Sequence, residues 1–138
     1  MKKYLLLIFT LFNLNSYSLY LLIKMGEDQK NHLKAYGIAY LALENEVKVD
    51  WLLNYEGGSF LIKYYSEIEK ECLIRDATYE IIPDLTSNNI LKKISSPSVN
   101  QDVIRLEKTP KIAIYSPQHK QPWDDAVTMA LTYAEIPY

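Results

Sequence analysis

The chain has 138 residues, of which 49% are apolar, and carries a formal net charge of −2 at pH 7. This apolar fraction is typical of globular proteins and excludes an intrinsically disordered chain. The length suffices for one domain with a hydrophobic core. The acidic balance argues against nucleic-acid binding, because phosphate backbones are bound by concentrated Lys and Arg.

Residues 1–18 have the pattern of a secretory signal. Two lysines follow Met1, Tyr4–Phe12 is an apolar run, and Ser16 and Ser18 place small residues at alternate positions. A signal peptidase cleaves after such a pattern, so we expect cleavage after Ser18 and a periplasmic, outer-surface or secreted protein.

Two alternatives for this segment stay open. Tyr4–Ile23 spans about the 20 residues that a membrane helix needs, so an uncleaved signal would anchor the chain, although the second half of this stretch contains Asn13 and Asn15. The segment would otherwise be a core strand of a cytosolic protein.

The remaining chain alternates strand and helix patterns. Apolar runs rich in β-branched and aromatic residues predict strands at 19–25, 47–53, 78–82 and 111–115. Helical periodicity and capping residues predict helices at 29–44, 65–76, 84–94 and from Pro122 onward. Between these lie a short apolar patch at 60–62, a linker at 95–100 and a short helical turn at 101–107.

This alternation predicts an α/β fold in which crossover helices join parallel strands. A further strand is then expected after Tyr138, to pair beside residues 111–115. The sequence therefore favours the front part of a longer protein, with a sheet that ends on a helix as the alternative.

Single residues of chemical interest have few companions. Cys72 is the one cysteine, so no internal disulfide can form, and Ile68 four residues earlier indicates that it packs as a small hydrophobe on a helix. His32 and His119 lack partners at metal-ligand spacing, and the sequence contains no HExxH, CxxC or Gly-x-Ser-x-Gly motif. We therefore assign no metal, cofactor or catalytic residue.

Two loops that follow predicted strands are candidate ligand sites, because ligands of open α/β sheets bind beyond the carboxyl ends of the strands. The first contains Asn54, Gly57, Gly58 and Ser59, where paired glycines would let a backbone approach a ligand. The alternative is a tight turn that requires positive φ angles.

The second loop joins a strand to a helix N-terminus, a natural anion or carbohydrate seat. Its candidate residues are Ser116, Trp123, Asp124 and Asp125. Trp123 would stack on a ring or pack in the core. The aspartates would bind hydroxyl groups or only favour the start of the helix.

Several segments together resemble a family of exported bacterial proteins commonly labelled "asparagine synthetase B". They are NHLKAYGIAY at 31–40, VDWLLNY at 49–55 with GGSF at 57–60, KIAIYSP at 111–117 and KQPWDDAV at 120–127. The resemblance implies an N-terminal α/β domain at 19–107. It also implies that residues 108–138 open a second, flavodoxin-like layer of glutamine-amidotransferase type, in a three-layer architecture.

The family label implies glutamine-dependent asparagine synthesis, which uses a cysteine directly after Met1 and a Ser-Gly-Gly-x-Asp-Ser loop for pyrophosphate. Here Lys2 follows Met1, and Glu56 precedes the Gly-Gly-Ser sequence. We therefore expect a ligand-binding or scaffold portion of an amidotransferase-like protein, with a small molecule or peptide as its ligand. The alternatives are an amide hydrolase or synthase with catalytic residues beyond Tyr138, and a surface interaction module.

Overall fold

The computed structural model describes residues 18–115 and 125–138. Its strands form one five-stranded sheet in the order β4-β1-β3-β2-β5, and every neighbouring pair is antiparallel. The strands are β1 (Leu19–Ile23), β2 (Val49–Leu53), β3 (Ser59–Lys63), β4 (Glu80–Pro83) and β5 (Asp102–Leu106).

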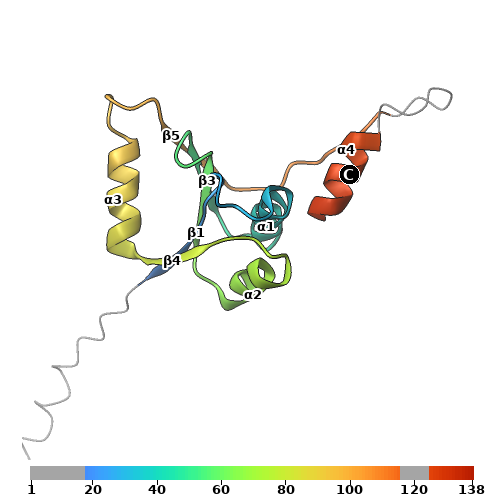
Figure 1. The fold of residues 1–138 in the computed structure, drawn as a ribbon, viewed down its shortest axis with the longest axis horizontal. Coiled ribbons are helices and arrows are strands. Elements are labelled where there is room, and N and C mark those ends of the chain that lie inside the picture. The colour runs from blue at the N-terminus through green and yellow to red at the C-terminus, as the bar shows by residue number, and fades with distance from the viewer. Residues whose placement is uncertain (1–17, 116–124) are drawn as a thin grey trace, which may run out of the picture.

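Helices cover both faces of this sheet (Figure 1). They are α1 (His32–Glu44), α2 (Ser66–Ile74), α3 (Asp84–Ile94) and α4 (Asp125–Ala134). Helices α1 and α2 lie on one face and α3 on the other, while α4 packs against α1 and not on the sheet (Figure 1).

The prediction of a parallel, flavodoxin-like sheet is wrong. The segments β1-α1-β2 and β3-α2-β4 each join two strands that run in the same direction. However, β3 lies between β1 and β2, and β1 lies between β3 and β4, so each strand meets only antiparallel neighbours. This interleaved β-α-β-β-α-β arrangement is the ferredoxin-like topology, extended here by α3 and β5.

One strand was not predicted, and two local predictions are also wrong. The apolar patch at 60–62 is the centre of β3, which forms a hairpin with β2. The predicted helical turn at 101–107 contains the edge strand β5. The predicted strand at 111–115 is irregular backbone, so the described chain has no strand between β5 and α4. The predicted strands at 19–25, 47–53 and 78–82 and the helices at 29–44, 65–76 and 84–94 are confirmed, with shifts at their ends.

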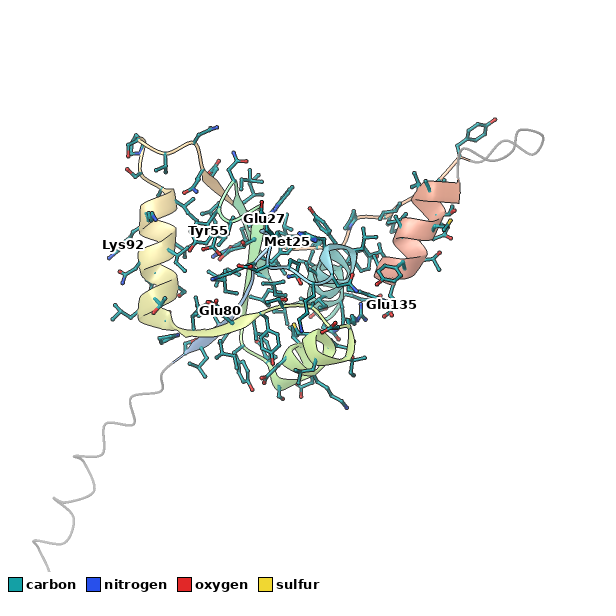
Figure 2. All side chains as sticks on the ribbon, viewed as in Figure 1. Met25, Glu27, Tyr55, Glu80, Lys92 and Glu135 are labelled. Atoms are coloured by element: carbon teal, nitrogen blue, oxygen red, sulfur yellow. The ribbon has the colours of Figure 1, made fainter. Side chains whose placement is uncertain are left out.

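Two hydrophobic cores lie on the two faces of the sheet. The core under α1 and α2 includes Ile38, Val49, Ile62 and Cys72, all fully buried. The burial of Cys72 in this core confirms its predicted packing role, and the same burial raises the pKa of its thiol to about 12. The smaller core under α3 includes Leu22, Leu52, Leu61, Ile82 and Ile94, with Tyr55 packed against it between α3 and the sheet (Figure 2).

The C-terminal end of α4 is fixed to α1 and α2 by a polar clasp. The Glu135 carboxylate bridges Lys34 Nζ at 2.6 Å and Arg75 Nη2 at 2.8 Å, and Asn31 Nδ2 donates to the Tyr133 hydroxyl at 2.8 Å. Gly37 permits this contact, because a Cβ there would lie only 1.8 Å from the Ala134 carbonyl oxygen.

Candidate functional site

The face of the sheet that carries α3 is covered at one end only. Side chains alternate along each strand, so Leu22, Leu52 and Leu61 point toward α3 and pack against Ile90 and Ile94. Toward the other end of the same face the strands present polar side chains: Tyr20 on β1, Asp50 on β2, Lys63 on β3 and Arg105 on β5. The register places Tyr20 opposite Lys63, and Asp50 between Leu61 and Arg105.

These polar side chains line a cavity of about 360 Å³. The buried Leu61, on the central strand β3, forms an apolar part of the cavity wall. Val47 also lines the cavity. The other lining residues are three cationic, two anionic and two phenolic side chains: Lys48, Lys63 and Arg105, Glu46 and Asp50, and Tyr20 and Tyr65. The cavity therefore combines a cationic excess with an apolar contact surface.

Asp50 and Arg105 form a bidentate ion pair across β2 and β5. Arg105 donates from Nε to Oδ1 at 2.8 Å and from Nη2 to Oδ2 at 3.1 Å. The Asp50 side chain is only 12% exposed, whereas that of Arg105 is 60% exposed. The Asp50 carboxylate, through its hydrogen bonds, raises the pKa of the Arg105 guanidinium, which therefore stays charged and oriented at the cavity wall.

The other two cations differ in how they are paired. Lys48 Nζ lies 2.7 Å from Glu107 Oε1, and this contact lowers the pKa of the Glu107 carboxyl. Lys63, Tyr20 and Tyr65 have no side-chain hydrogen bond or ion pair to any other residue that the structure describes. The cavity thus offers one unneutralised ammonium and two free phenol groups to a ligand.

The predicted glycine turn is built into the fold between β2 and β3. Gly57 has a φ of +81°, and a Cβ there would lie 2.1 Å from the Met25 carbonyl oxygen. Gly58 accepts a hydrogen bond from Trp51 Nε1 at 3.0 Å. The buried Ser59 hydroxyl donates to the carbonyl groups of the preceding turn, and Asn54 Nδ2 donates to the Asn100 carbonyl oxygen at 3.0 Å. All four candidate residues therefore have structural partners, and ligand binding there stays a prediction.

Most of the second predicted loop lies outside the described residues. This part includes the candidates Ser116, Trp123 and Asp124. Asp125 is described only as the first residue of α4. The stacking or core role expected for Trp123 therefore stays a prediction.

Sequence reasoning missed the polar end of the sheet because its residues come from strands far apart in the chain. One local signal was present: Lys48 and Asp50 alternate with the apolar Val47, Val49 and Trp51, as in a strand with one face buried. Nothing in the sequence placed Arg105 beside Asp50, because the pattern of residues 101–107 did not predict a strand.

Within residues 18–115 and 125–138, no helix has the length and apolarity to cross a membrane. The same residues contain no group of three or more His, Cys, Asp or Glu side chains arranged to hold a metal ion. Comparisons with protein-family models, with curated proteins and with solved structures found no match to this chain.

Proposed function

We propose that the described domain is a non-catalytic binding module whose ligand is a small organic anion, held in the cavity on the α3 side of the sheet. The observation that carries this proposal is the unpaired Lys63 beside Tyr20, in a cavity that also contains Lys48 and Arg105. A carboxylate or phosphate group of the ligand would complete the hydrogen bonds of these donors.

The apolar part of the cavity determines what else the ligand contains. Leu61 forms an apolar contact surface, and the rings of Tyr20 and Tyr65 form apolar walls with polar tips. A ligand that pairs one anionic group with a small ring or aliphatic body would contact both kinds of surface. The proposal retains the ligand-binding role expected from the sequence and moves it to a different set of residues.

Titration with benzoate tests this proposal, because benzoate joins a carboxylate to a ring. Benzamide is the control ligand, since it has the same shape without the charge. We expect weak but saturable binding of benzoate by calorimetry or NMR and no saturable binding of benzamide. Equal binding of both compounds would contradict the anionic-ligand assignment.

The matching variant is Lys63→Gln, which removes the unpaired charge. We expect benzoate affinity to fall about tenfold, as for the loss of one charge-assisted hydrogen bond. Lys92→Gln is the control, because Lys92 is an exposed lysine on α3, away from the cavity (Figure 2). An equal loss in both variants would show that only overall charge matters.

A further inference from the structure

Two opposite charges in the cavity on the α3 side of the sheet stay unpaired after its other charges have found partners. Arg105 is neutralised by Asp50, and Lys48 forms an ion pair with a carboxylate that does not line the cavity. Among the charged side chains of the lining, this leaves Lys63 as the unpaired cation and Glu46 as the unpaired anion within the described part of the chain. The unpaired charges of the cavity are therefore one positive and one negative group.

Glu46 lines the cavity where the chain passes from α1 to β2. It follows the last residue of α1 by two positions, and the C-terminal end of a helix carries a partial negative charge. The exposed side chain of Glu46 has no hydrogen bond or ion pair with any residue that the structure describes, and Lys63 is one of these. A cation bound here would be stabilised by both the free carboxylate and the helix end.

The surface that adjoins this end of the cavity is also acidic. A neighbouring hollow of about 370 Å³ shares Val47 and Tyr65 with the cavity, and its charged lining residues are Glu67 and Glu71. Glu67 has no ion pair within the described ranges, 18–115 and 125–138. Negative charge thus collects where the cavity borders α1 and α2, whereas the unpaired positive charge lies at the end of β3.

From these two unpaired charges we propose that the ligand is a zwitterion, which joins an ammonium and a carboxylate group to an apolar body, as an apolar α-amino acid does. This inference rests on the proposed function, because the carboxylate is the anionic group already assigned to Lys63. The ammonium group would contact Glu46, and the apolar body would contact Leu61 and the rings of Tyr20 and Tyr65. A ligand with an anionic group alone would leave Glu46 unpaired and place two negative charges in one cavity.

NMR titration of the full chain with phenylalanine and with hydrocinnamate tests the inference, because hydrocinnamate is phenylalanine without its amino group. We expect phenylalanine to bind about threefold to fivefold more tightly, which is the gain from one exposed ion pair. If hydrocinnamate binds as tightly as phenylalanine or more tightly, the zwitterion is wrong and the anion site stands. If neither compound shows saturable binding, the inference and the proposed function are both wrong.

The matching variant is Glu46→Gln, which removes the charge and keeps nearly the same side-chain size. The affinity for phenylalanine should fall about threefold to fivefold, whereas that for hydrocinnamate should not fall. Glu44→Gln is the control, because it removes the same charge from an exposed residue at the end of α1 that does not line the cavity. This control should keep the natural ratio of the two affinities. An unchanged ratio in Glu46→Gln, or an equal change in both variants, would overturn the inference.

Discussion

Of the four helices in the described residues, three are followed by an acidic residue in the left-handed conformation that usually favours glycine. Glu46, Asp76 and Glu135 have φ angles of 60°, 51° and 59°. In each case the next amide donates to the carbonyl group five residues earlier, as Val47 does to Ala42, which is the Schellman pattern. These residues therefore carry backbone strain that a glycine would not have.

Glu46→Gly should raise the free energy of unfolding by about 0.5–1 kcal/mol, because Glu46 is exposed and has the left-handed conformation at the end of α1. Chemical denaturation measures the change. Glu44→Gly is the control, since Glu44 is the last residue of α1. It should destabilise the protein by about 0.5–1 kcal/mol. A loss of stability in both variants would contradict the strain argument.

Gly57→Ala should destabilise the protein by at least about 2 kcal/mol, since the added Cβ meets the Met25 carbonyl oxygen and the φ angle is strained for alanine. Gly26→Ala offers a comparison. A Cβ at Gly26 would have its nearest neighbour at 3.7 Å, so we expect a change within about 0.5 kcal/mol. Thermal or chemical unfolding of the two variants distinguishes a required glycine from a tolerated one.

At the scale of elements, the attachment of α4 includes two ion pairs, which join Glu135 to Lys34 and Arg75. Lys34, through its hydrogen bond, lowers the pKa of the Glu135 carboxyl below its ordinary value, and Arg75 adds to this effect. Because the folded-state pKa is depressed, this contribution to stability is complete above the ordinary pKa. It is lost as the pH falls through the folded-state value. Acid should therefore loosen α4.

Hydrogen exchange of the α4 amides, corrected for the intrinsic effect of pH, checks this expectation. Protection should fall between neutral pH and about pH 3. Glu135→Gln should lower protection already at neutral pH and remove most of the dependence on pH. Glu107→Gln removes a carboxylate with a similarly lowered pKa at a different place, so α4 should behave as in the natural chain. Equal responses of the two variants would contradict a local clasp.

Element types were largely predictable, because they depend on local pattern. The residues of α1, α2 and α3 and of β1, β2 and β4 have clear periodicity or β-branched runs. Strand β5 was missed because its sequence, DVIRL, has charged residues at positions 1 and 4 of five. Its strand conformation comes from pairing with β2, which a single sequence does not reveal.

At the scale of the whole molecule, the order of the strands decides where the site lies. The predicted alternation of strands and helices does not contain β3, and it does not say which strand a crossover passes over. The interleaved order places β3 at the centre and brings Lys63 beside Tyr20, 43 positions earlier in the chain. The cavity therefore could not be predicted, although each of its residues is visible in the sequence.

The central claim is that the uncovered end of the α3-side face binds a small organic anion. The most direct measurement is the map of amide chemical-shift changes in ¹⁵N NMR spectra as benzoate is added. The account predicts changes confined to the strands around Tyr20, Asp50, Lys63 and Arg105, and a half-saturating benzoate concentration about tenfold higher when Lys63 is replaced by glutamine. Changes centred on the Gly57–Ser59 turn or on α4, or an unchanged half-saturating concentration in Lys63→Gln, would contradict it.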